Sequence, residues 1–211
     1  MKWLASMGLG GAVLALFAAI TSLAIGWTYL GTKAQIELAV RRAEAQQLME
    51  IFPRDTHDNE LVDDTFVLEA ETPLLGLRAE RQGYRVRKDQ RVVGVILPAT
   101  ARDGYSGDIR ALIGVRSDGS IAGVRVVAHK ETPGLGDKVD LRKSRWILGF
   151  NERSLGNPAI RDWTVSKDGG AFDQFTGATV TPRAVTLATR RALEYAELHR
   201  ADLFEIPGDN P

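Results

Sequence analysis

The 211-residue sequence contains no cysteine, which excludes disulfide bonds, thiolate metal sites, iron–sulfur ligation and a cysteine-linked lipid anchor. Its three histidines, His57, His129 and His199, are too scattered to suggest a metal site. Lysine plus arginine number 27, and aspartate plus glutamate also number 27. This balance gives no electrostatic reason to expect a nucleic-acid partner. The Gly-x-Gly-x-x-Gly fingerprint is also missing, which argues against NAD binding by this chain.

Charge is missing from one long stretch, because no residue between Lys2 and Lys33 is charged. The apolar run is long enough for the helix of about 20 residues that crosses a bilayer. Trp27 and Tyr29 fall where an interfacial aromatic belt would lie. A cleaved signal peptide is the alternative, but this run exceeds the usual apolar core of about 7–15 residues and lacks a convincing cleavage site. We therefore predict a transmembrane anchor over residues 1–31, with the lipid bilayer as a partner.

The next segment predicts a helix that continues beyond the anchor. Apolar residues recur at helical spacing over residues 32–52, and Pro53 ends the helix. A polar, acidic loop follows, so residues 32–64 are predicted to be a helical linker and loop.

Residues 65–211 carry the pattern of a separate domain. Short alternating runs predict antiparallel strands, most clearly a hairpin with Asp118-Gly119 in its turn. Residues 162–170 predict a further strand and turn, and residues 141–150 fit either a short helix or an irregular segment. A helix is predicted from Pro182, with Thr181 as its N-cap. The fold class is therefore α+β, with an antiparallel sheet and flanking helices.

The run DQFTGATVTPRAV, which starts at Asp173, holds the main candidate for chemistry. A helix start presents unpaired N–H groups and the positive end of the helix dipole, and so attracts anions. Gly177 and Ala178 are small enough to let a phosphate approach Thr179. From these residues alone, simple capping by Thr179 and Thr181 is the commoner explanation.

Three segments resemble the FMN-binding domain family. The family's flavinylation motif, Asp-x-x-(Ser/Thr)-Gly-Ala-Thr, is matched by Asp173-x-x-Thr176-Gly177-Ala178-Thr179. HKETPGLGDKV from His129 and GYSGDI from Gly104 resemble other parts of the family pattern. Over essentially the whole chain, the order of segments resembles the RnfG proteins of Rnf-type electron-transport complexes. A related protein of the sodium-pumping quinone reductase, NqrC, shares the motif but usually has a larger insert.

The resemblance implies one FMN per chain, joined through its phosphate to the hydroxyl of Thr179 by a flavin transferase. Asp173 would be recognised by that transferase. Backbone amides around Gly134 and Gly136 would bond flavin oxygens, and Lys167 would stabilise negative charge on the reduced flavin. The full set of implied cofactor-binding residues is Thr176, Gly177, Ala178, Thr179, Glu131, Thr132, Gly134, Leu135, Gly136 and Lys167. The resemblance implies no catalytic residue and no metal ligand.

Several of these residues have plainer explanations. Glu131 is as easily a solvated loop charge. Trp146 and Trp163 are candidates to cover the flavin, but large aromatic side chains more often belong to a core or an interface.

The resemblance implies a membrane-anchored electron carrier, with the other proteins of an Rnf-type complex as partners. The complex would couple electron transfer between NADH and ferredoxin-like carriers to ion translocation. The domain would lie on the periplasmic side of a bacterial inner membrane. The positive-inside count, with Lys33, Arg41 and Arg42 after the anchor, slightly favours the opposite orientation, although Glu37 and Glu44 are mixed among these charges. Two alternatives are a flavin-free membrane-tethered interaction module, in which Thr179 is only a cap, and a free-standing flavin reductase.

Overall fold

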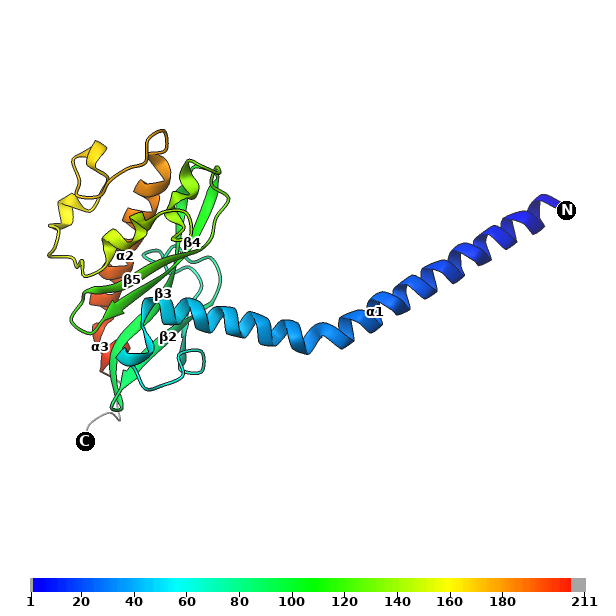
Figure 1. Cartoon of the computed structure of the whole chain (residues 1–211), viewed down its shortest axis with the longest axis horizontal. Helices are drawn as coiled ribbons and strands as arrows, with labels where there is room; N and C mark the ends of the chain where they lie inside the picture. The colour runs from blue at the N-terminus through cyan, green and yellow to red at the C-terminus, as the bar shows by residue number, and fades with distance from the viewer. Residues whose placement is uncertain (1, 206–211) are drawn as a thin grey trace. The chain divides into compact units, whose positions relative to one another are not determined.

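The computed structural model describes the backbone of residues 2–205 and the side chains of residues 11–205. It divides into two compact units, Met1–Glu44 and Ala45–Pro211. Helix α1 (Lys2–Ile51) contains all described residues of the first unit and ends inside the second (Figure 1). The predicted continuation of the helix beyond the anchor is confirmed.

The first unit has the surface of a membrane-crossing helix. Within the described side chains, α1 is long and apolar enough to span a bilayer. Its large apolar side chains, such as Leu23 and Trp27, are exposed. The hydroxyls of Thr21 and Thr28 donate to the carbonyls of Phe17 and Ala24, so these polar groups are satisfied within the helix.

The second unit is built on a five-stranded antiparallel sheet whose strands follow the chain order β1-β2-β3-β4-β5. The strands are β1 (Thr65–Leu68), β2 (Arg81–Lys88), β3 (Arg91–Gly104), β4 (Gly107–Arg116) and β5 (Ile121–Ala128). The β4–β5 turn contains Gly119 at φ 83°, a left-handed conformation that glycine adopts without strain. The predicted α+β fold and this hairpin are confirmed.

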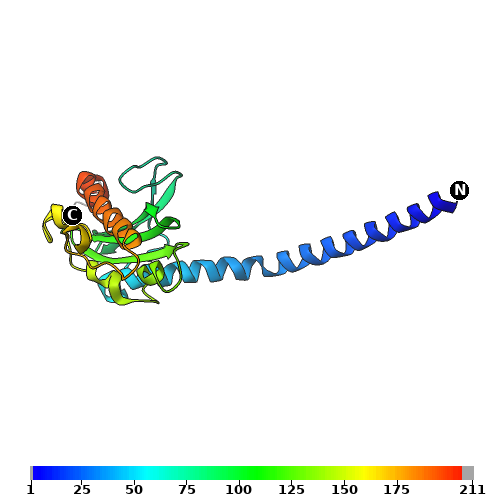
Figure 2. The ribbon, with the colours of Figure 1, turned by 90° about the horizontal axis from the view of Figure 1, so that it is seen from above.

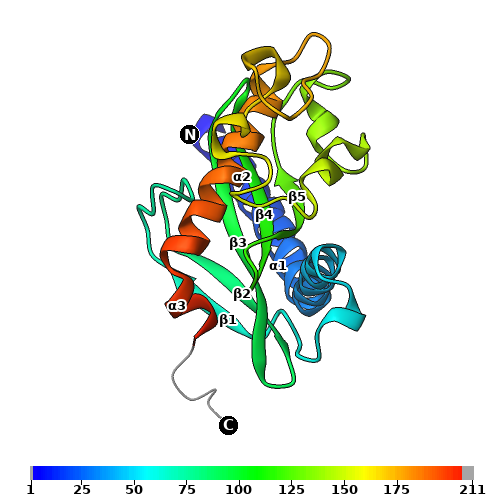
Figure 3. The ribbon, with the colours of Figure 1, turned by 90° about the vertical axis from the view of Figure 1, so that its left-hand side faces the viewer.

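Two C-terminal helices cover one face of the sheet. Helix α2 (Val180–Leu198) packs on β3 and β4, and α3 (Arg200–Phe204) packs on β3 (Figures 2 and 3). Alternate residues of β4, including Ile109, Ile113 and Val115, are buried beneath them. This layer holds the larger core of the domain.

The end of α1 covers the opposite face (Figure 2). Leu48, Ile51 and Phe52 are almost fully buried there. An added Cβ on Gly94 would lie 2.4 Å from the Phe52 ring, and one on Gly114 would lie 2.2 Å from Ile51 Cγ2. The absence of side chains at these two glycines therefore lets the helix end approach the sheet backbone. We call this set of five residues the glycine cradle.

Two local predictions are wrong. Residues 162–170 form no strand. The segment contains the end of η4 (Ile160–Asp162), the fully buried Trp163 and η5 (Ser166–Asp168), and Val165 makes an isolated bridge to Phe172. Helix α2 begins at Val180, so Thr181 is not its N-cap. The undecided stretch at 141–150 contains a 3₁₀ helix, η3 (Arg145–Phe150). Two further short 3₁₀ helices, η1 (Arg54–Thr56) and η2 (Gly136–Val139), lie in connections.

Candidate cofactor site

A pocket of about 320 Å³ lies where three segments of the domain meet. They are the tip of the β3–β4 hairpin, the loop that follows β5, and the start of α2. The lining residues are Tyr105, Glu131, Thr132, Leu135, Gly136, Gly177, Ala178, Thr179, Val180 and Thr181. The volume is near the lower end of the about 300–1,000 Å³ typical of small-ligand pockets, so a large ligand would extend beyond it.

The start of α2 supplies the features that suit a phosphate. Thr179 is the residue before the helix, and its side chain makes no capping hydrogen bond. The N–H groups of Val180 and Thr181 belong to the first turn, where no carbonyl of the helix is available to accept them. Gly177, at φ 81°, turns the chain here without adding a side chain. The arrangement presents a hydroxyl and free donors in one wall, which fits an anion near Thr179.

The loop after β5 is a compact turn around one carbonyl. The oxygen of Thr132 accepts from the N–H groups of Leu135, Gly136 and Asp137 at 3.1, 3.1 and 3.4 Å. The Gly136 amide is therefore already bonded inside the loop, contrary to the expectation that it serves a flavin oxygen. Leu135 remains 42% exposed, so this wall offers an apolar surface to a ligand.

Glu131 is not a solvated loop charge, because only 4% of it is exposed. Its Oε1 accepts from the Ser106 N–H at 2.9 Å, and its Oε2 accepts from the Thr181 hydroxyl. Its own N–H donates to His129 Nδ1 at 3.1 Å.

The pocket brings together seven of the ten cofactor-binding residues expected from the sequence, Thr179 among them. Thr176, Gly134 and Lys167 are outside the lining. Lys167 lies in η5, where its N–H donates to Gln174 Oε1 at 3.0 Å. Asp173 is exposed outside the pocket, within reach of another protein.

Sequence reasoning missed Tyr105, Val180 and Thr181 as lining residues. Tyr105 is 73% exposed at the hairpin tip, although it faces the pocket. The run GYSGDI marks a tight turn, since glycines flank its Tyr-Ser pair, but the sequence does not show that this turn lies beside α2.

Both candidate tryptophans serve the scaffold. Trp146 contacts Phe175 edge to face and donates from Nε1 to the Asp173 carbonyl at 2.8 Å. Trp163 is fully buried and packs against Phe150 and Phe172. Neither lines the pocket, but Trp146 holds the backbone of the segment that leads to Thr179.

An ion pair fixes η5 against the first turn of α2. Arg183 donates to both oxygens of Asp168, at 2.5 and 2.8 Å. These hydrogen bonds lower the pKa of Asp168 and raise the pKa of Arg183.

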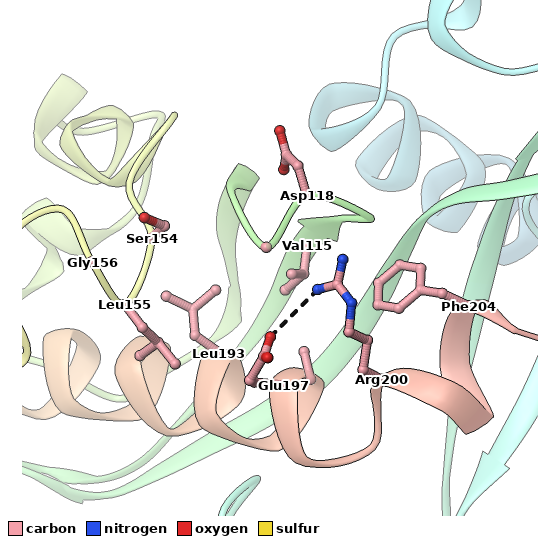
Figure 4. Close-up of a pocket in the computed structure, with 11 residues that line it drawn as sticks. Val115, Asp118, Ser154, Leu155, Gly156, Leu193, Glu197, Arg200 and Phe204 are labelled. Atoms are coloured by element: carbon pink, nitrogen blue, oxygen red, sulfur yellow. Dashed lines mark hydrogen bonds and ion pairs between the residues drawn. The ribbon is translucent and has the colours of Figure 1, made fainter.

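A larger cavity, of about 470 Å³, lies toward the C-terminal end of α2 (Figure 4). Leu193 and Val115 contribute apolar surface, and Arg200 and Glu197 form an ion pair there. None of the residues expected to bind a cofactor lines this cavity.

Comparisons with known proteins agree with the geometry. Residues 104–194 match the FMN-binding domain family, a range that contains all three walls of the pocket. Residues 1–51 match the family described as the RnfG N-terminal region, and this match ends where α1 ends.

Three relatives are similar over most of their length, and each is named as the G subunit of an ion-translocating oxidoreductase complex. The protein from Pseudoalteromonas atlantica is 45% identical over 94% of this chain and 92% of its own. The one from Pseudomonas aeruginosa is 50% identical over 82% of this chain and 80% of its own. The one from Vibrio cholerae is 41% identical over 93% of each chain. The chain therefore belongs to the RnfG family, the G subunits of ion-translocating oxidoreductase complexes.

Proposed function

We propose that this protein is a membrane-anchored electron carrier within an ion-translocating oxidoreductase complex. Residues 1–31 would be the anchor, residues 32–64 the linker, and residues 65–211 the FMN-binding domain. Family membership and the match to FMN-binding domains support an electron-transport role. The complex would couple electron transfer between NADH and ferredoxin-like carriers to ion movement, with NADH bound by other proteins of the complex.

We further propose that FMN is attached through its phosphate to the Thr179 hydroxyl, one per chain. The observation that carries this proposal is the position of that hydroxyl. It lies in the pocket before the first turn of α2, without a capping bond. Gly177 and Ala178 keep bulk away from it, and the amides of Val180 and Thr181 would receive the phosphate oxygens.

The rest of the pocket fits a flavin ring. Leu135 and Tyr105 provide exposed apolar and aromatic surface for a planar ring. When bound, FMN supplies the capacity to accept and donate electrons. The protein would hold it by the phosphate and leave part of the ring open, which suits exchange of electrons with neighbouring proteins.

The direct test uses the full chain co-expressed with a flavin transferase. We expect yellow fluorescence that stays with the protein band after denaturation. Mass spectrometry should show a gain of one FMN less one water on the peptide that contains Thr179. Thr179→Ala should abolish both signals, whereas Thr72→Ala, a change outside the motif and the pocket, should keep the mass gain because the acceptor hydroxyl remains.

The same experiment separates the alternatives. A folded wild-type chain without bound flavin would favour the tethered interaction module. Rapid reduction of the isolated flavinylated chain by NADH would favour the free-standing reductase.

The proposed periplasmic location has a separate test. Because the chain has no cysteine, Glu80→Cys would create one exposed thiol in the domain. A membrane-impermeant maleimide should label it in spheroplasts before lysis. Labelling only after lysis would place the domain in the cytoplasm.

A further inference from the structure

Glu131 links segments that are far apart in the sequence. Its Oε1 bonds the backbone of Ser106 in the hairpin tip, 25 residues earlier. Its Oε2 bonds the hydroxyl of Thr181 in α2, 50 residues later. Glu131 itself begins the loop that forms the remaining wall. One carboxylate therefore contacts all three walls of the pocket.

The loop passes very close over this carboxylate. A Cβ added to Gly136 would lie 2.9 Å from Glu131 Oε2 and 2.7 Å from Thr181 Oγ1. Thr181 is 1% exposed, so the bond between these two side chains is shielded from water. Within residues 11–205, no basic group pairs with Glu131, and a buried carboxylate without a counter-ion depends on its hydrogen bonds.

The bonds of Glu131 also argue against direct contact with a phosphate. Both carboxylate oxygens of Glu131 already accept from the protein. The nearby donors suited to an anion are instead the amides at the start of α2.

We propose that Glu131 is a positioning residue, which ties the hairpin tip, the loop and the start of α2 into one pocket. Through Ser106 it fixes the neighbouring Tyr105, and through Thr181 it fixes the helix start next to Thr179. The effect on a bound flavin rests on the proposed function, whereas the two hydrogen bonds of Glu131 are a property of this chain alone.

The side-chain chemistry of Glu131 defines a graded set of variants. Glu131→Gln keeps one acceptor for the Ser106 N–H, and its NH₂ group can donate to Thr181 Oγ1, since a hydroxyl also accepts. Glu131→Asp is one methylene shorter and cannot reach both partners. Glu131→Ala loses both bonds.

Hydrogen–deuterium exchange measures how firmly Glu131 holds these segments. The sample is the full chain in detergent, produced without a transferase. In Glu131→Ala we expect about tenfold faster exchange in residues 104–107 and 132–137, the factor that corresponds to about 1.4 kcal/mol. Glu131→Gln should remain near wild type, and Glu131→Asp should fall between them. Unchanged exchange in Glu131→Ala, or equal acceleration in Glu131→Gln, would overturn the proposal.

A second pair of variants covers the case in which Glu131→Ala fails to fold. Thr181→Val removes the hydroxyl at nearly constant volume, and Thr181→Ser keeps it. Thr186→Val is the matched control, because Thr186 is equally buried but bonds the Pro182 carbonyl of its own helix. We expect faster exchange of the loop in Thr181→Val, and not in Thr181→Ser or Thr186→Val. If the loop exchanged equally fast in Thr181→Val and Thr186→Val, the proposed role of Glu131 would also be overturned.

The flavinylated protein supplies an independent readout. Visible circular dichroism reports how rigidly the pocket holds the ring, and we expect its amplitude to fall at least twofold in Glu131→Ala and Thr181→Val relative to the wild type. If wild-type protein carries no flavin, the proposed function fails, while the exchange data still test whether Glu131 holds the three segments together. If wild-type protein carries flavin and these variants keep its full dichroism, the inference about Glu131 fails alone.

Discussion

Gly136→Ala tests the pocket with the smallest possible addition. The new methyl carbon would lie 2.7 Å from Thr181 Oγ1, 2.9 Å from Glu131 Oε2 and 3.1 Å from Glu131 Cβ. Because ordinary carbon contacts are about 3.5–4.0 Å, either the loop or the Glu131–Thr181 bond must move. Overpacking of this kind costs about 1–3 kcal/mol.

The expected effect can be measured by thermal unfolding. In a domain of about 150–250 residues, 1 kcal/mol lowers the melting temperature by about 2–4 °C. Gly136→Ala should therefore melt about 2–12 °C below the wild type. The flavinylated variant should also show weaker visible dichroism, since the displaced loop carries Leu135.

Gly149→Ala is the matched control. It makes the same chemical change in η3, where nothing beyond the neighbouring residues and the backbone of the same turn lies within 4 Å of the added carbon. We expect its melting temperature to stay within about 2 °C of the wild type, as for substitutions that create no clash. If Gly136→Ala and Gly149→Ala have the same melting temperature and the same flavin dichroism, then the loop does not pass as close to Glu131 as the structure places it.

Three further changes have separable outcomes. Phe52→Ala should cost about 3–5 kcal/mol in urea unfolding, because it empties a buried site against the sheet; a loss below about 1 kcal/mol would contradict that packing. Trp146→Phe keeps an aromatic ring but removes the donor to the Asp173 carbonyl, so it should cost about 1 kcal/mol by thermal unfolding, and no change would show that this bond is dispensable. The hydrogen bond from Arg142 lowers the pKa of Asp140, so the stability it contributes is present above the unfolded pKa near 3.8 and is lost as the pH falls through the lower folded value. Asp140→Asn should thus melt lower at pH 7 and lose less on acidification, whereas parallel melting–pH curves would refute the linkage.

Local pattern predicted much of the fold. In β4, Ile109, Ala111, Ile113 and Val115 alternate with a period of two. Asp118-Gly119 marks a turn that needs a left-handed residue. Helix α2 was recognised from its apolar face, although its start lies earlier than Pro182. The 162–170 segment failed because its apolar residues alternate as in a strand, yet Trp163 is held by contacts with Phe150 and Phe172 rather than by a neighbouring strand.

The candidate site was predicted where the chain carries a contiguous motif, and missed where it depends on contacts between distant segments. Gly177, Ala178 and Thr179 are neighbours in the sequence and lie together in the pocket. The burial of Glu131 could not be predicted, since its partner Thr181 is 50 residues away. Tyr105 shares this difficulty, because only tertiary packing brings the hairpin tip to the start of α2.

The glycine cradle determines where a fragment for work in solution should begin. A fragment starting at Thr65 would lose Leu48, Ile51 and Phe52, and would leave an apolar sheet surface bare, a predicted site of aggregation. A fragment starting at Ala45 would discard the membrane-crossing length yet keep those three side chains. Preparations of the second kind should stay monodisperse, because the last turns of α1 still cover that face of the sheet.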